Sequence, residues 1–173
     1  LALLKNRIAK SPQEIESDLR IEGERETIAI SDKVVAATSD EKNQLEKLYQ
    51  TPSEKIAVIP PGVDITRFYP IPADEAKEFV GIPKDERMLL FVGRIEPLKG
   101  IDILIRALAQ LRHADVLSEC PHYLYIIGGE PDADSQNMNQ EMRRLQNLCR
   151  ELGVGDLVLF LGKRDQDTLQ YYY

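Results

Sequence analysis

Short apolar runs alternate with stretches of helical periodicity along most of this 173-residue chain. Five runs bounded by charge, glycine or proline have the length and composition of buried strands: 33–38, 56–59, 88–92, 122–127 and 157–161. Apolar residues three and four apart predict amphipathic helices between them, one ending before Thr51 and others over 73–81, 101–113 and 139–152. This alternation is typical of βαβ units and predicts an α/β fold with parallel sheets.

Capping signals predict where two helices begin. Ser11-Pro12-Gln13-Glu14 combines an N-cap serine, a proline at the first helical position and a glutamate three residues after the cap. A heavily charged helix is therefore expected from about Pro12 towards Ile30, interrupted or weakened near Gly23. Thr38 and Glu41 repeat the capping-box spacing before the next helix.

Residues 60–72 break the alternation. They hold four of the ten prolines, one glycine and no periodicity, which favours a domain boundary, although a long surface loop inside one domain would look the same. We predict that residues 1–61 are the C-terminal part of a first domain, 62–72 an interdomain hinge, and 73–173 the first part of a second domain. Because the chain opens on a leucine and stops within a helix-like pattern, we expect it to be a piece of a longer protein.

The strand at 88–92 and the helix at 101–113 are joined by a loop with two cations. Arg94 and Lys99 bracket this loop, and Gly93 and Gly100 lie at its ends. A helix that begins near the carboxyl end of a parallel strand directs unpaired N–H groups and partial positive charge at the crevice there. With a planar guanidinium and an ammonium beside it, such a helix end suits a diphosphate. The alternative is that Arg94 and Lys99 are solvated surface charges and that the glycines only mark the ends of an ordinary loop.

A second pair of glycines follows the strand at 122–127. Gly128 and Gly129 permit close approach of the backbone to a ligand, and an ordinary tight turn explains them almost as well.

Composition excludes several classes of protein. A net charge of −7 and a pI near 5.0 argue against a nucleic-acid binder. No apolar run approaches the roughly eighteen residues of a transmembrane helix, and no signal-peptide pattern opens the chain. Cys120 and Cys149 fit reduced thiols, so a cytoplasmic protein is expected. The two histidines, His113 and His122, form no cluster with metal-ligand spacing, and neither a metal nor a cofactor is expected.

Two strings resemble a known family. V-G-R-I-E-P-L-K-G-I-D at 92–102, followed by L-I-R-A-L, closely resembles the opening of the C-terminal domain in the retaining glycosyltransferases of family 4, which include sucrose-phosphate synthases and the mycothiol-pathway glycosyltransferase. V-I-P-P-G-V-D-I-T-R-F-Y-P at 58–70 is similar to the interdomain hinge of that family. The resemblance implies the GT-B fold, with two doubly wound Rossmann-like domains, of which this chain covers the end of the first and the beginning of the second.

The resemblance also implies roles for residues of the donor side. Arg94 and Lys99, with Gly93, would hold the diphosphate of a nucleotide sugar. Gly128 and Gly129 would lie at the donor cleft. The loop after the strand at 157–161 would contact the nucleotide base, which makes Lys163 and Arg164 further donor-site candidates.

On the acceptor side, members of the family whose acceptor is a sugar phosphate or inositol phosphate have an R-x-x-x-E stretch on a helix of the N-terminal domain, and its arginine contacts the acceptor phosphate. Arg20 and Glu24 have this spacing, with Glu24 placed to orient Arg20 through an i,i+4 ion pair. An ordinary charged helix face explains Arg20 equally well. The plant synthases have a different loop in place of R-I-E-P-L-K-G, which leaves the identity of the acceptor open.

The implied reaction moves a hexosyl group from a nucleotide sugar, such as UDP-glucose, to a sugar or sugar-phosphate acceptor, with retention and without a metal ion. The E-x7-E glutamates of the family are expected after Tyr173, and its N-terminal glycine-rich loop and a histidine facing the sugar are also missing. We therefore expect the chain by itself to be inactive.

Two other classes of protein remain as alternatives. An NAD-dependent dehydrogenase would show the same alternation, but no G-x-G-x-x-G follows any predicted strand. A non-catalytic relative that binds only a nucleotide or a protein partner is also compatible with a resemblance at the level of the fold. Two glutamates eight residues apart beyond Tyr173 would favour the enzyme.

Overall fold

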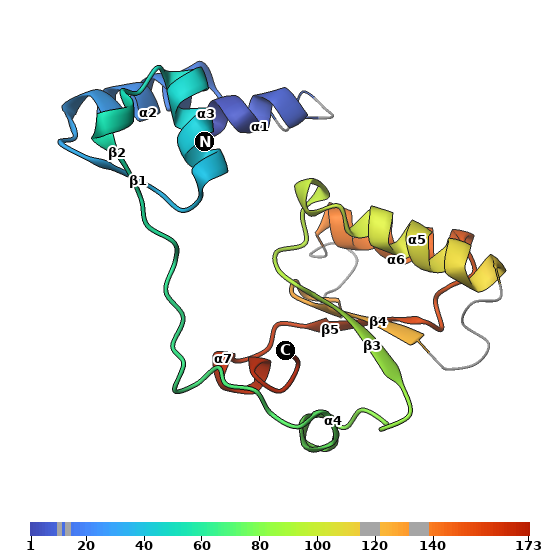
Figure 1. Cartoon of the computed structure of the whole chain (residues 1–173). Coiled ribbons are helices and arrows are strands. Elements are labelled where there is room, and N and C mark those ends of the chain that lie inside the picture. The colour runs from blue at the N-terminus through green and yellow to red at the C-terminus, as the bar shows by residue number, and fades with distance from the viewer. Residues whose placement is uncertain (10–11, 13–14, 115–121, 132–138) are drawn as a thin grey trace. The chain divides into compact units, whose positions relative to one another are not determined.

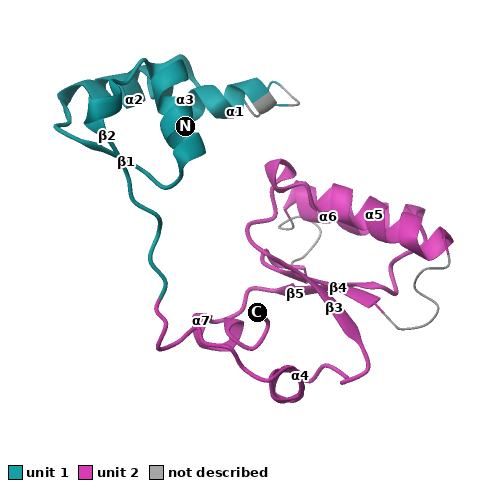
Figure 2. Cartoon of the chain, viewed as in Figure 1, with its two compact units in different colours: residues 1–63 teal, residues 64–173 magenta. Residues whose placement is uncertain are grey.

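The computed structural model describes residues 1–9, 12, 15–114, 122–131 and 139–173 (Figure 1). The chain divides into two compact units, Leu1–Val63 and Asp64–Tyr173 (Figure 2). The predicted hinge at 62–72 spans this division. From Asp64 onward it belongs to unit 2, where Arg67 pairs with Asp167 at 3.4 Å and the Phe68 ring meets Tyr173 edge-on. Movement about this segment remains a prediction.

Unit 1 has two parallel strands among helices. Its elements are α1 (Ala2–Ile8), α2 (Asp18–Ile30), β1 (Val34–Ala36), α3 (Ser39–Tyr49), a 3₁₀ turn (Ser53–Lys55) and β2 (Ile56–Val58). β1 pairs with β2 in parallel, with Val34 opposite Ile56. Ala36, Leu45 and Ile56 form its buried core. The strands predicted at 33–38 and 56–59 are therefore present, and both are shorter than predicted.

The predicted start of α2 was wrong. The helix begins at Asp18, where the Ser17 hydroxyl accepts the Arg20 N–H, and the residues from Ile15 to Ser17 are not helical. Asn6 of α1 accepts the Glu16 N–H at 2.7 Å and donates to the Glu16 carbonyl at 3.2 Å. A tertiary contact thus holds Glu16 outside the helix. Of the Ser11 capping box, Ser11, Gln13 and Glu14 lie outside the described residues.

Two other local predictions in unit 1 had different outcomes. α2 continues through Gly23, so the predicted interruption was wrong; one glycine costs only about 1 kcal/mol in a helix interior. At α3 the capping box is confirmed, because the Thr38 hydroxyl accepts the Glu41 N–H at 3.1 Å. The Glu41 carboxylate accepts the Ala37 N–H at 2.6 Å, one residue before the Thr38 N–H that a capping box would use.

Unit 2 is built on a three-stranded parallel sheet. Its elements are α4 (Ala73–Val80), β3 (Arg87–Val92), a 3₁₀ turn (Pro97–Lys99), α5 (Ile101–His113), β4 (His122–Ile127), α6 (Gln140–Glu151), β5 (Val158–Gly162) and α7 (Gln166–Leu169). The strand order is β3-β4-β5, with Val92 opposite Ile127. The predicted helix at 101–113 and the strands at 88–92, 122–127 and 157–161 are confirmed, with ends that agree to within one residue.

The central strand β4 is buried on both faces. Leu124 and Ile126 pack into one core with Ile105 of α5 and Leu145 of α6, and Figure 1 shows both helices on that face of the sheet. The alternate residues of β4, Tyr125 and Ile127, pack into a second core with Ile82 and Tyr172. Continuous apolar character along β4 therefore follows from helices or loops that cover each face.

No helix among the described residues is long and apolar enough to cross a membrane. Cys120 lies outside the described residues.

Candidate functional site

The carboxyl ends of β3, β4 and β5 meet at one edge of the sheet, and a glycine lies at each end. The Gly93 N–H donates to the Ile127 carbonyl at 3.0 Å, and the Gly128 N–H donates to the Gly162 carbonyl at 2.8 Å. The fold thus brings together three loops that are distant in the sequence. Gly93 and Gly128 are 35 positions apart, and Gly128 and Gly162 are 34 positions apart. In open α/β sheets, ligands bind in the crevice beyond this edge.

Close packing explains the glycine pair after β4. A Cβ atom at Gly128 would lie 1.9 Å from the Gly93 carbonyl oxygen, and Gly128 has a φ of +138°. At Gly129, a Cβ atom would lie 2.8 Å from both Ile95 and Met142. No side chain fits at either position without displacing its neighbours. The two glycines therefore let the backbones of adjacent loops approach closely at the sheet edge.

Arg94 and Lys99 lie on the loop between β3 and α5, as predicted. The Arg94 side chain is 79% exposed and pairs with Glu96 at 3.0 Å. Lys99 is exposed and ends the 3₁₀ turn; Gly100 then adopts a left-handed φ of +65° that admits α5. No side chain caps the first turn of α5, a fully described helix. No N-cap side chain therefore accepts a hydrogen bond from the first N–H groups of α5, and two exposed cations lie on the loop that precedes them.

The structure separates the two cations predicted after β5. Lys163 pairs with Glu130 at 2.6 Å, which joins the loop after β5 to the loop after β4 and lowers the pKa of the Glu130 carboxyl. Arg164 instead donates to the backbone carbonyls of Leu161, near the end of β5, and of Lys163, and to the Tyr172 hydroxyl. Lys163 is therefore held at the sheet edge, whereas Arg164 serves to fold its own loop.

The start of α6 also contacts the β3–α5 loop, and this contact was not predicted from the sequence. Asn139 caps α6 by accepting the Glu141 N–H at 2.8 Å and donates to the Ile95 carbonyl at 3.4 Å. Arg144 forms a bidentate pair with the buried Glu141 and lies 3.7 Å from Asp102 in the first turn of α5. The i,i+3 spacing of Glu141 and Arg144 is visible in the sequence, but the contact with Asp102 depends on the packing of α5 against α6.

In unit 1, Arg20 lines a cavity of about 490 Å³ formed by α2, β1, α3 and the first residue of the chain. The predicted pair of Arg20 with Glu24 is present at 3.5 Å, and a second carboxylate, Glu16, lies 3.0 Å from the guanidinium. Glu24 also accepts hydrogen bonds from the Tyr49 hydroxyl and the Ala2 N–H. Burial raises the pKa of Glu24, but these bonds outweigh it and hold that pKa below its usual value.

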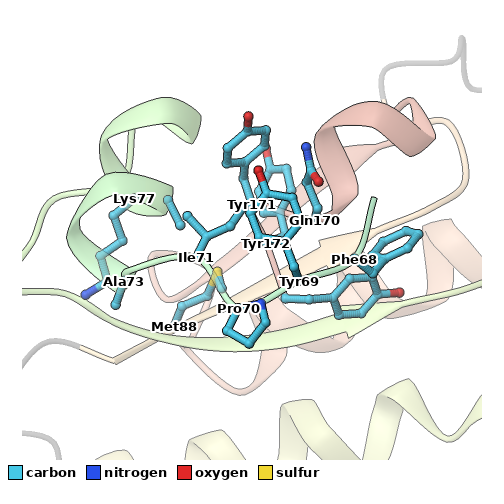
Figure 3. A pocket seen from close by; sticks show the side chains of 12 residues that line it. Phe68, Tyr69, Pro70, Ile71, Ala73, Lys77, Met88, Gln170, Tyr171 and Tyr172 are labelled. Atoms are coloured by element: carbon cyan, nitrogen blue, oxygen red, sulfur yellow. The ribbon is translucent and has the colours of Figure 1, made fainter. Parts of the chain in front are cut away.

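A second cavity, of about 520 Å³, lies in unit 2 among aromatic side chains (Figure 3). Tyr171 stacks on Phe79 with ring centroids 3.8 Å apart, and the ammonium of Lys77 donates to two backbone carbonyls. Tyr171 and Tyr172 thus serve packing. The thiol of Cys149 is buried in the core, which raises its pKa to about 11 and makes it a poor nucleophile.

Among the residues that the structure describes, no three side chains of His, Cys, Asp or Glu converge to hold a metal ion. The expectation of a reaction without metal stays a prediction.

Two protein families match the chain in succession. The family described as Glycosyltransferase Family 4 matches residues 4–67, and the family described as Glycosyl transferases group 1 matches residues 72–173, which is more than half of the chain. D-inositol 3-phosphate glycosyltransferase from Actinosynnema mirum is 36% identical over the whole chain, and a second enzyme of that name, from Thermomonospora curvata, is also 36% identical. The chain spans about 40% of the length of these relatives.

Solved structures agree with these matches. Sucrose-phosphate synthase (tll1590) from Thermosynechococcus elongatus superposes with a TM-score of 0.81 and 28% identity, over 99% of this chain and 40% of that enzyme. Anabaena Alr3699/HepE, solved in complex with UDP and glucose, superposes with a TM-score of 0.70 over 94% of this chain and 41% of its own, at 22% identity, which supports the fold alone. The dehydrogenase alternative has no support from these matches. The chain belongs to the group 1 glycosyltransferases of the family 4 type, and its two units are parts of the GT-B fold.

Proposed function

We propose that the full-length protein carrying this chain transfers a hexosyl group from a nucleotide sugar to a phosphorylated polyol or sugar, with retention of configuration. One observation carries the donor half of this proposal: on the loop between β3 and α5, Arg94 directly follows Gly93, where Gly93, Gly128 and Gly162 meet, and Lys99 lies just before the uncapped N-terminus of α5. Exposed cations, free N–H groups and a backbone surface without side chains are the requirements of a diphosphate site.

Arg94, Lys99 and the N-terminus of α5 would also promote departure of the nucleoside diphosphate from the donor. When the glycosidic bond to the nucleoside diphosphate breaks, negative charge develops on the leaving phosphate oxygen. Arg94, Lys99 and the α5 dipole stabilise that charge more than the charge of the intact donor, which lowers the barrier. Because cations of the chain fill this role, we propose that no metal ion is needed for departure of the leaving group.

Support for the acceptor comes from unit 1 and from the relatives. The relatives named D-inositol 3-phosphate glycosyltransferase and the sucrose-phosphate synthase both have a phosphorylated compound in their names. Arg20 lines the cavity of unit 1 and can offer its guanidinium to a phosphate. The flanking carboxylates Glu16 and Glu24 fix the orientation of Arg20, and a phosphate would have to draw it partly away from them.

The test is product analysis with the full-length protein. UDP-, ADP- and GDP-hexoses are each incubated with phosphorylated and unphosphorylated forms of inositol and of hexoses, and the products are followed by NMR. We expect release of one nucleoside diphosphate only with a phosphorylated acceptor, and a product with the anomeric configuration of the donor. Binding of nucleotide without transfer to any acceptor would instead indicate a non-catalytic relative, and an inverted product would refute retention.

A further inference from the structure

Asp102 places a negative charge where the donor site needs positive charge. It lies in the first turn of α5, three residues after Lys99, and its side chain is only 18% exposed. An aspartate in the first turn stabilises the helix through the dipole. The same charge opposes an anionic ligand at that helix end, because like charges within about 10 Å of each other repel appreciably at physiological salt.

Arg144 lies against this aspartate from the neighbouring helix. Its Nη2 atom is 3.7 Å from Asp102 Oδ2, and Nε and Nη2 each lie 2.7 Å from an oxygen of Glu141. Figure 1 shows α5 and α6 side by side on one face of the sheet, which places the start of α6 next to the start of α5. Asp102, Glu141 and Arg144 together carry a charge of −1, and loss of the arginine would make it −2.

The Glu141 pair also holds the guanidinium in place. The Glu141 carboxylate is 8% exposed and binds Arg144 through both oxygens, which is the most restrictive geometry available to this pair. Asn139 further ties the start of α6 to the Ile95 carbonyl, inside the β3–α5 loop. The arginine is thus fixed relative to the loop that carries Arg94 and Lys99.

We propose that Arg144 strengthens binding of the donor diphosphate by offsetting the charge of Asp102, without touching the ligand itself. The proposal rests on the proposed donor site at Arg94 and Lys99. It assigns Arg144 a role in affinity through electrostatics, distinct from the direct contacts of the loop cations.

The experiment measures nucleotide binding by titration calorimetry with the full-length protein, using whichever of UDP, ADP and GDP binds most tightly and the matching nucleoside. Arg144→Gln should weaken diphosphate binding by about three- to tenfold and leave nucleoside binding unchanged, because only the diphosphate meets the uncovered charge. Adding Asp102→Asn to that variant should restore most of the affinity. Arg150→Gln, which removes the same charge from the last turn of α6, serves as the matched control and should have no effect.

A purely structural role of Arg144 predicts a different pattern. In that case Asp102→Asn would not rescue Arg144→Gln, and diphosphate and nucleoside binding would fall together; either result overturns the proposal. Arg144→Gln leaves the buried Glu141 without its partner and could fail to fold, so Asp102→Asn is also tested alone. We expect it to raise diphosphate affinity, and a decrease would overturn the proposal.

Failure of the donor site itself can be told apart from failure of this inference. If Arg94→Ala and Lys99→Ala leave diphosphate affinity unchanged, the donor site is misplaced and both proposals fall. If those variants weaken binding while Arg144→Gln does not, only the role of Arg144 is refuted.

Discussion

At the scale of single residues, Gly128 is the glycine at which the structure tolerates a side chain least. Its Cβ position is 1.9 Å from a backbone oxygen, and backbone atoms cannot move aside as a flexible side chain can. We expect Gly128→Ala to destabilise the protein by about 3 kcal/mol or more, from the clash together with the positive φ. Gly155→Ala is the matched control, because a Cβ atom there meets open space, and it should change stability by less than about 0.5 kcal/mol. Equal urea midpoints for the two variants would contradict the packing described for the sheet edge.

Arg20 is the second residue whose role can be tested alone. Arg20→Ala should raise the KM for a phosphorylated acceptor about ten- to a hundredfold, because it removes a charge-assisted hydrogen bond worth roughly 1.5–3 kcal/mol. The KM for the unphosphorylated analogue should stay within about twofold, since that analogue offers no anion to the guanidinium. Steady-state kinetics with both acceptors make the comparison. An equal change in both constants, or none in either, would assign Arg20 to the charged surface of α2.

The candidate site shows what residue patterns can predict. The position of Arg94 and Lys99 on a loop between a strand and a helix is confirmed, because these elements follow one another directly in the sequence, and their role in binding a diphosphate stays a prediction. The hydrogen bonds of Arg164 to the Leu161 and Lys163 carbonyls could not be predicted, since they depend on the path of the chain where it leaves β5. The contact between Arg144 and Asp102 joins residues 42 positions apart and depends on how two helices pack.

At the scale of elements, the packing of α5 on the sheet rests on a few fully buried side chains. Ile105 is 0% exposed and belongs to the core shared with α6 and β4, whereas Ile103, two residues earlier, is 60% exposed. Ile105→Ala should lower the free energy of unfolding by about 2–5 kcal/mol, because it loses buried methyl groups and leaves a cavity. Ile103→Ala should change it by less than about 0.5 kcal/mol. Chemical denaturation would compare them, and similar losses in both would place the wrong face of α5 in the core.

Element prediction succeeded where the local signal matched the tertiary environment. The helix predicted at 101–113 agrees with α5, and the apolar positions 101, 105 and 108 of its predicted face are buried. Leu104 and Leu111, which belong to the same predicted face, are 41% and 39% exposed. The predicted start of α2 was wrong because Asn6 forms hydrogen bonds with the backbone of Glu16, a contact that no capping rule includes. The interruption predicted at Gly23 is absent, because the other residues of the 13-residue helix stabilise it by more than one glycine destabilises it.

At the scale of the whole molecule, we expect the two units to move relative to one another about residues 60–72. The division between the units falls at Val63, and residues 59–63 have neither helix nor strand. Binding of donor and acceptor by different domains would favour a closed arrangement that excludes water. Small-angle scattering of the full-length protein should show a smaller radius of gyration with both ligands present. Superimposable curves at saturating ligand would contradict closure, and the Arg94→Ala/Lys99→Ala double variant is the control that should not respond.

The central claim is that Arg94 and Lys99 bind the diphosphate of the donor, and calorimetric titration of the full-length protein with nucleoside diphosphate tests it most directly. Each of Arg94→Ala and Lys99→Ala should lower the affinity about ten- to a hundredfold, which corresponds to the loss of one charge-assisted contact. Arg106→Ala, an exposed change of the same charge farther along α5, should leave the affinity within about twofold of the unmodified protein. The pair of Arg94 with Glu96 is exposed and contributes little to stability, so the loss cannot be attributed to unfolding. Unmodified affinity in both loop variants would contradict the account.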